Sequence, residues 1–190
     1  MNLKIIAEKA EKFARDEIEK YGLPWIEHFN ISLEKGIKIA EKLWANIELV
    51  KIWVSLMDVK LWQAFSEKRV WEHVKMSSEA TKEFLKDFEI DKKTFEIIIE
   101  AVEWHHWKEK FDNLEAEITA NADCYRFISP KGIFYFFSVL GRRFWDDLWK
   151  IVENVESKMD EKMNIVSLDF VKQELEPVYK NMKKYFKESK

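Results

Sequence analysis

The sequence predicts an all-α fold, a multi-helix bundle in a single domain that covers residues 1–190. Apolar residues recur at three- and four-residue spacing along most of the chain, as they do in amphipathic helices. Only four glycines and three prolines interrupt this pattern. Hydrophobic residues make up 47% and charged residues 35% of the chain, a composition typical of a folded helical protein with one sizeable core.

Each expected helix is a periodic segment that ends at turn-forming or charged residues. The segments are 3–21, 32–47, 48–65, 70–88, 91–107, 114–127, 144–159 and 168–186. Gly22 and Pro24 end the first, because glycine suits a helix C-terminus and proline cannot extend a helix. Asp91 is a good N-cap for the fifth. Ser129, Pro130 and Gly132 mark a break before the aromatic-rich run 134–137, and Pro130 suits the first turn of a helix. Pro177 is expected to kink the last helix.

One acidic residue, Asp58, lies in the most apolar of these segments, 48–65. We therefore expect this helix to be central and Asp58 to lie in or beside the interior. A buried carboxylate without a partner costs several kcal/mol or takes up a proton. The sequence thus predicts a cationic partner for Asp58, either a basic side chain or a metal ion.

Charge and cysteine content exclude several classes of function. The net charge is −3 with basic and acidic residues interspersed, so duplex nucleic acid is not an expected partner. The single cysteine, Cys124, excludes an intramolecular disulfide and fits a reducing compartment. Residues 1–20 carry too many charges for a signal peptide, and no window is apolar enough to span a membrane. We expect a cytoplasmic protein.

All the histidines fall close to predicted helix ends or apolar runs, and with two acids they form a possible ligand set for a divalent metal. The six residues are His28, His73, His105, His106, Asp58 and Asp123. A single histidine in a helix is more often structural than a metal ligand, and a single aspartate is more often a cap or an ion-pair member. Their order along the chain is what favours a metal site.

That order resembles the HD-domain superfamily of metal-dependent phosphohydrolases. In this family a first histidine is followed about thirty residues later by a His-Asp pair in an apolar helix, and a further aspartate lies on a later helix. His28, Asp58 and Asp123 match these places. The segments that also resemble the family are 72–80, 101–106 and 114–123. The resemblance spans residues 25–127, and the helices in 129–190 have no assigned role.

The chain departs from the family at Met57, which stands where the histidine of the His-Asp pair is expected. A thioether is a weak ligand for a hard divalent ion. The resemblance implies a first metal position held by His28, Asp58 and Asp123. It implies a second position held by His73 and one or both of His105 and His106, with Asp58 as a bridge.

The resemblance further implies a divalent metal cofactor (Mn, Fe, Co, Ni, Zn or Mg) and hydrolysis of a phosphate ester, with a small nucleotide or other phosphorylated molecule as substrate. Asp58 would be the catalytic residue. Basic residues near the expected ligands are candidates for binding the substrate phosphate, although each is more often a surface charge: Lys60, Arg126, Lys131, Arg142 and Arg143. The alternative, motivated by Met57, is an HD-like protein that has lost catalysis and serves as a metal-binding, ligand-binding or scaffold module.

Two further patterns stay open. Glu103 and His106 form one Glu-x-x-His motif of the kind that di-iron helical bundles use, but such bundles need two copies. Trp104 and Trp107 flank the paired histidines and could pack in the core or form a wall of a base-binding pocket. An exposed subset of the nine tryptophans would instead favour a homo-oligomer.

Overall fold

The computed structural model describes residues 2–21, 26–104, 111, 113–143 and 147–189. These residues form helices joined by short connections, without any strand among them, which confirms the all-α prediction. The helices, in chain order, are α1 (Leu3–Lys20), α2 (Ile26–Leu43), α3 (Ile47–Leu56), α4 (Leu61–Ser66), the 3-10 helix η1 (Val70–Glu72), α5 (His73–Leu85), α6 (Lys92–Trp104), α7 (Leu114–Ile128), α8 (Pro130–Arg143), α9 (Leu148–Ile165) and α10 (Asp169–Ser189).

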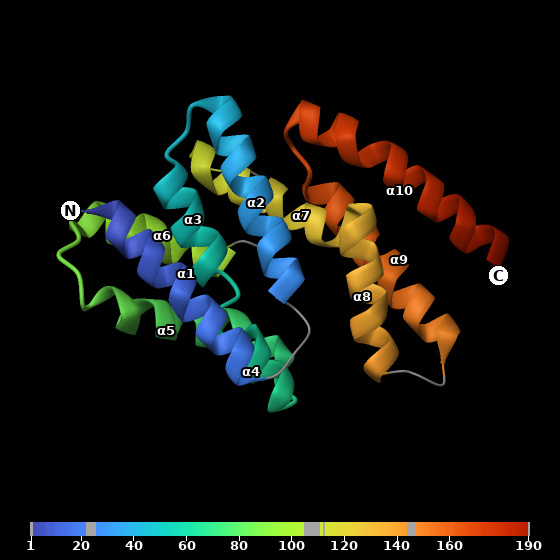
Figure 1. The fold of residues 1–190 in the computed structure, drawn as a ribbon, viewed down its shortest axis with the longest axis horizontal. Coiled ribbons are helices and arrows are strands. Elements are labelled where there is room, and N and C mark those ends of the chain that lie inside the picture. Colours follow the sequence, from blue (N-terminus) through green and yellow to red (C-terminus); the bar gives the residue numbers. More distant parts are fainter. Residues whose placement is uncertain (1, 22–25, 105–110, 112, 144–146, 190) are drawn as a thin grey trace.

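Helix α7 is the centre of the fold. It packs against α2 and α3 on one side and against α8, α9 and α10 on the other (Figure 1). Every residue of α7 from Ile118 to Ile128 is buried, including the polar ones. The polar side chains of α7 must therefore find their partners inside the protein, because an unpaired buried polar group is costly.

Two clusters of buried apolar side chains hold the helices together. The larger surrounds α7 and takes side chains from α2, α8, α9 and α10, among them Phe29, Phe136 and Met159. The smaller joins α1, α3, α5 and α6 and includes Trp53 and Ile98. Helix α3 contributes to both clusters, as the most apolar segment of the sequence was expected to do.

The helix predicted over 48–65 is not continuous, and this is a correction to the sequence-based prediction. Helix α3 ends at Leu56, and α4 begins only at Leu61. Between them, the backbone N–H of Leu61 donates to the carbonyl of Asp58 at 2.9 Å, and that of Lys60 donates to Ser77 Oγ at 3.1 Å. Asp58 therefore lies in the turn between two helices.

A second correction concerns residues 130–143, for which the sequence predicted no complete helix. It predicted a break at 129–132, with Pro130 suited to a helical first turn, and an aromatic-rich run over 134–137. They form helix α8, which begins with Pro130 and follows α7 after only Ser129. Proline suits this position because the first residues of a helix need no N–H donor. The Ser129 hydroxyl donates to the carbonyl of Tyr125 at 2.6 Å and accepts the Gly132 N–H at 3.2 Å, which bridges the two helices.

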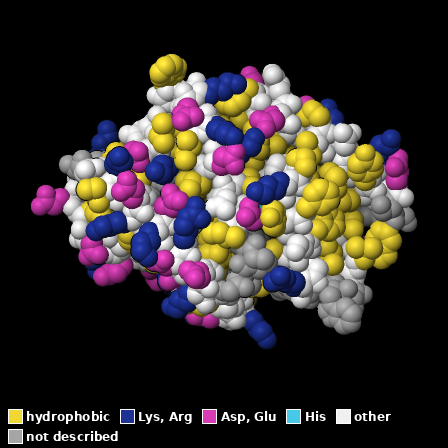
Figure 2. Space-filling view, in the orientation of Figure 1, with side chains coloured by type: hydrophobic (Ala, Val, Ile, Leu, Met, Phe, Trp, Pro, Cys, Tyr) yellow, Lys and Arg dark blue, Asp and Glu magenta, His cyan; other side chains and the backbone are white. Residues whose placement is uncertain are grey.

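The view in Figure 2 shows acidic and basic side chains interspersed over the part of the molecule that contains α1. Apolar side chains gather instead over the α8 to α10 part, where Phe134 and Tyr185 are exposed. None of the helices in the described residues combines the length and apolar character that crossing a bilayer requires.

The close approach of α8 to α7 depends on Gly132, and this gives a first testable prediction. A Cβ at this position would lie 2.4 Å from the carbonyl oxygen of Arg126 and 2.5 Å from that of Tyr125. Gly132→Ala must push α8 away from α7 and should lower the free energy of unfolding by about 2–3 kcal/mol, as overpacking does. Urea denaturation followed by circular dichroism measures this change.

Gly141, on the same helix, is the matched control, because a Cβ there meets no atom of the described residues within 4 Å. Gly141→Ala should raise the free energy of unfolding by about 0.5–1 kcal/mol, since alanine loses less conformational freedom than glycine on forming a helix. Similar effects of the two substitutions would show that helix propensity, rather than the contact with α7, controls this position.

Candidate functional site

A cavity of about 230 Å³ opens between α4, η1, α5, α7, α8 and α9. One part of its wall is polar and carries His73, Asp58, Asp123, Arg126, Lys158 and Lys162. The rest is apolar and includes the aromatic side chains of Trp62, Phe65, Phe127 and Phe136. The cavity combines a concave apolar surface with a few converging charged groups, as small-molecule binding sites do.

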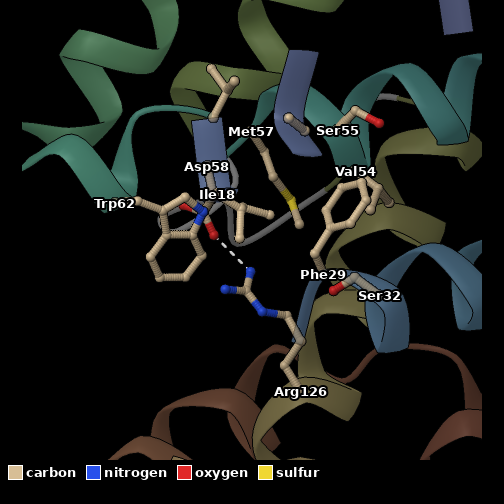
Figure 3. Close-up of a pocket in the computed structure, with 11 residues that line it drawn as sticks. Ile18, Phe29, Ser32, Val54, Ser55, Met57, Asp58, Trp62 and Arg126 are labelled. Carbon is tan, nitrogen blue, oxygen red and sulfur yellow. Dashed lines mark hydrogen bonds and ion pairs between the residues drawn. The ribbon is translucent and has the colours of Figure 1, made fainter. Parts of the chain in front are cut away.

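Two carboxylates and two cations form an ion-pair cluster at the polar side of this cavity. Arg126 Nη1 lies 2.6 Å from Asp58 Oδ2 and 2.7 Å from Asp123 Oδ1, so one guanidinium nitrogen joins both acids. Lys162 Nζ lies 2.7 Å from Asp123 Oδ2. Figure 3 shows the Arg126 side chain extending from α7 to meet Asp58. We call Asp58, Arg126, Asp123 and Lys162 the charge cluster.

The helices bring these four residues together in a simple way. Asp123 and Arg126 are three residues apart on α7, so they share one helix face. The turn between α3 and α4 adds Asp58, and α9 adds Lys162. The cluster is nearly dry: the side chain of Lys162 is 1% exposed and that of Arg126 is 4% exposed.

Electrostatics keep the cluster charged at neutral pH. Burial alone would raise the pKa of Asp123, but the positive charges of Lys162 and Arg126 outweigh it and hold that pKa below its usual range. Burial would lower the pKa of Lys162, but Asp123 outweighs it and raises that pKa. Buried ion pairs of this kind are strongly destabilised by removal of one partner, because the other charge is left uncompensated.

His73 borders the charge cluster. Its Nδ1–H donates to the carbonyl of Val70 at 2.6 Å, which leaves Nε2 to face Asp58 Oδ1 at 3.6 Å. The structure therefore brings together three of the six residues in the predicted ligand set, namely Asp58, Asp123 and His73.

His28 is completely buried and is not among the residues that line the cavity. Its Nε2–H donates to the carbonyl of Gly132 at 3.1 Å, and its ring packs edge-on against Phe127 with 5.3 Å between the ring centroids. Burial, reinforced by the positive charge of Arg126, lowers the pKa of His28 to about 3. In this environment His28 connects α2 to α8.

The lowered pKa of His28 predicts a pH-dependent stability. In the unfolded chain a histidine binds a proton below about pH 6.5, whereas the folded protein keeps His28 neutral down to about pH 3. Neutral His28 therefore lowers the free energy of unfolding as the pH falls below about 6.5, by about 1.4 kcal/mol per pH unit, and it has no such effect above about pH 6.5. His28→Gln should reduce the slope of unfolding free energy against pH by this amount between pH 6 and 4.5. Urea titrations at several pH values measure both slopes. The slopes of the wild-type protein and of His28→Gln should coincide above pH 7. Equal slopes below pH 6 would contradict the prediction.

Among the other predicted site residues that the structure describes, Arg126 lines the cavity, whereas Lys60, Lys131 and Arg142 do not. His105 and His106 lie outside the described residues, as does the side chain of Arg143. Lys60 Nζ pairs with Glu17 Oε2 at 2.7 Å. Lys131 pairs with Glu27 at 2.7 Å, and Arg142 is exposed on α8. Arg126 does line the cavity, but its guanidinium is bound to the two aspartates.

Met57 is 2% exposed and belongs to the larger apolar cluster. Figure 3 shows its thioether pointing toward Phe29. The same view shows the carboxylate of the next residue, Asp58, directed to Arg126. Met57 thus contributes to apolar packing beside the charge cluster.

The residues of the charge cluster do not fit a divalent metal. Both carboxylate oxygens of Asp123, and Oδ2 of Asp58, already accept from protein cations at 2.6–2.7 Å. The two positive charges balance the two negative ones, so a divalent ion would add two uncompensated charges to a buried site. In the described part of the chain, no three His, Cys, Asp or Glu side chains are grouped to hold a metal.

Sequence reasoning missed Lys158 and Lys162, although the pattern of α9 contains a signal for the second. The buried residues of α9 are Ile151, Val152, Val155, Met159 and Lys162, which recur with helical spacing. Lys162 therefore occupies the apolar face of an amphipathic helix, the same anomaly that drew attention to Asp58. A buried lysine needs an anionic partner, which for Lys162 is Asp123 rather than Asp58.

Comparisons with solved structures identify the fold. The protein is similar to Bacillus subtilis YpgQ, with a TM-score of 0.69 and 18% sequence identity over 99% of this chain and 95% of that one. It is also similar to a predicted HD superfamily hydrolase from an uncultured Thermotogales bacterium, with a TM-score of 0.59 and 20% identity over 93% of this chain and 99% of that one. No protein-family model and no curated protein sequence matches the chain. The chain thus has an HD-like helical fold, which confirms the fold class predicted from the sequence.

Proposed function

We propose that this protein is a catalytically impaired HD-like protein that binds a small anionic molecule in the cavity beside the charge cluster. The observation that carries the proposal is the pairing of Asp58 and Asp123 with Arg126 and Lys162, at 2.6–2.7 Å. Protein cations pair with three of the four carboxylate oxygens of the two aspartates that the resemblance to HD-domain hydrolases assigns to a metal.

The cavity supports binding rather than a purely structural role. It is open to ligands of modest size and has four aromatic side chains in its wall. The charge cluster stabilises the cavity, because it ties α7 to α9 and to the turn before α4. The proposal therefore keeps the binding pocket of the fold and omits metal-assisted hydrolysis.

Metal analysis and a turnover screen test this proposal. Purified full-length protein is measured for bound metals and then assayed on phosphate monoesters and nucleotides with added Mn²⁺, Ni²⁺, Co²⁺ or Mg²⁺. We expect less than one tenth of an equivalent of any metal per chain, and turnover no greater than that of Asp58→Ala. Metal-dependent turnover that Asp58→Ala abolishes would overturn the proposal.

The second candidate function is the one that the resemblance implies, a metal-dependent phosphohydrolase that acts on a small nucleotide or another phosphate ester. Two observations favour it: the HD-like fold, and the position of His73 with Nε2 3.6 Å from Asp58. The same screen decides between the two candidates, because robust turnover supports the hydrolase.

A further inference from the structure

We propose that the cavity binds an amphipathic monocarboxylate, with its carboxylate at Lys158 and Lys162 and its apolar body against the aromatic wall. This inference rests on the proposed function and specifies the ligand class. Three sets of observations support it: the arrangement of cations around one ring, the charge balance of the cavity wall, and the size and apolar character of the remaining wall.

Three cations surround the ring of Phe127. The distances to its centroid are 5.3 Å from Arg126 Cζ, 5.5 Å from Lys158 Nζ and 5.6 Å from Lys162 Nζ. Cation–π attraction accounts for one such contact, but three like charges on one ring also repel each other. An anion bound beside Phe127 would relieve this repulsion, and the two lysines line the cavity where it would bind.

Lys158 is the cation best placed to bind a ligand. It lies four residues before Lys162 on α9, so the two ammonium groups share a helix face, an arrangement that is unfavourable for like charges. Burial and the charge of Lys162 lower the pKa of Lys158. Its partner Glu161, at 2.7 Å, has a side chain 45% exposed and does not line the cavity. A ligand carboxylate can therefore compete with Glu161 from the cavity side.

The charge balance of the wall favours a single negative charge. Among the described residues that line the cavity, Arg126, Lys158 and Lys162 carry three positive charges, and Asp58 and Asp123 carry two negative ones. Glu161, outside this lining, pairs with Lys158 at 2.7 Å and lies 3.5 Å from Lys162, so a ligand that displaces it needs only one negative charge. A phosphate dianion would bring a second negative charge close to the two aspartates, which like-charge repulsion disfavours.

The size and lining of the cavity favour an apolar body. The cavity measures about 230 Å³. Pockets for larger organic ligands usually measure about 300–1,000 Å³, so a nucleotide is not the expected occupant. Trp62, Phe65, Val139 and Leu140 present apolar surface to the cavity.

Isothermal titration calorimetry of the full-length protein with sodium octanoate tests the inference. We expect one saturable site per chain, with 1-octanol binding at least tenfold more weakly because it lacks the carboxylate. Inorganic phosphate and adenosine monophosphate are titrated in parallel as phosphate probes. Absence of octanoate binding at millimolar concentration, or equal binding of octanol, would overturn the inference.

Substitutions locate the site. Lys158→Met should weaken octanoate binding at least tenfold, whereas Lys150→Met, an exposed lysine on the same helix, should leave it unchanged. Val70→Trp, which fills the cavity from η1, should abolish binding without removing any charge. Circular dichroism confirms that each variant is folded. Unchanged octanoate binding in Lys158→Met would contradict the placement of the carboxylate.

The outcomes separate this inference from the proposed function. Binding of adenosine monophosphate in place of octanoate would overturn the ligand class but leave a non-catalytic binding protein. Metal-dependent turnover would overturn the proposed function, whether or not octanoate binds.

Discussion

Arg126→Met should lower the free energy of unfolding by about 3–5 kcal/mol, the usual cost of removing one partner from a buried ion pair. Arg126 Nη1 contacts both Asp58 Oδ2 and Asp123 Oδ1, so the substitution removes a cation from two carboxylates at once. Asp123 keeps Lys162 at 2.7 Å, whereas Asp58 loses the cation that lies 2.6 Å from its Oδ2. Methionine replaces the aliphatic part of the Arg126 side chain but not the guanidinium, so the loss combines the removed charge with the removed volume. Urea denaturation at pH 7 measures it.

Arg142→Met is the matched control, because Arg142 is exposed on α8 and its loss should change the unfolding free energy by less than about 0.5 kcal/mol. The double variant Asp58→Asn/Arg126→Met should be more stable than Arg126→Met alone, because it removes the uncompensated carboxylate together with the cation. If Arg126→Met cost less than 1 kcal/mol, the charge cluster would not be a stabilising part of the fold.

The helical fold could be predicted from the sequence because it depends on a repeated local signal. The spacing of apolar residues in 3–21 and 114–127 corresponds closely to α1 and α7. The break after Leu56 could not be found in this way. Residues 57–60 contain neither glycine nor proline, and the turn depends on Ser77, seventeen residues beyond Lys60, which accepts the Lys60 N–H.

The candidate site was only partly predictable, for a physical reason. The spacing of the sequence identified Asp58 and Asp123 as candidate site residues. It also predicted a cationic partner for Asp58, which could be either a basic side chain or a metal ion. The choice between them depends on Lys162, which lies 39 positions after Asp123 and reaches its carboxylate only because α9 packs against α7. Helical periodicity describes each segment separately and cannot supply this contact.

The resemblance to HD-domain hydrolases was more informative about fold than about chemistry. The fold depends on the packing of many apolar positions, which tolerate substitution. A metal site depends on a few donors in one geometry, and a single cation among them changes what it can bind. Arg126, first considered as a contact for a substrate phosphate, is that cation here.

Removing the cations of the charge cluster should create affinity for a divalent metal. Asp58 Oδ2 and Asp123 Oδ1 lie 2.6 and 2.7 Å from the same nitrogen of Arg126, so they converge on one point. Oxygen ligands bind divalent ions at about 2.0–2.6 Å, which requires only a small inward movement. Arg126→Met leaves the cluster with a net charge of −1, and Arg126→Met/Lys162→Met leaves it with −2. Affinity for Mn²⁺ should therefore increase at least tenfold at each step from the wild-type protein.

Calorimetry with Mn²⁺ measures the affinities, and thermal denaturation gives an independent readout, because a ligand at one hundred times its Kd stabilises the folded state by about 2.7 kcal/mol. Added Mn²⁺ should thus restore much of the stability that Arg126→Met loses, whereas Arg142→Met and the wild-type protein should not respond. If the wild-type protein bound Mn²⁺ as tightly as the double variant, the cations would not be what excludes the metal. The hydrolase would then be the better account of the site. The order of the three affinities therefore tests the physical premise of the proposed function without relying on any assay of turnover.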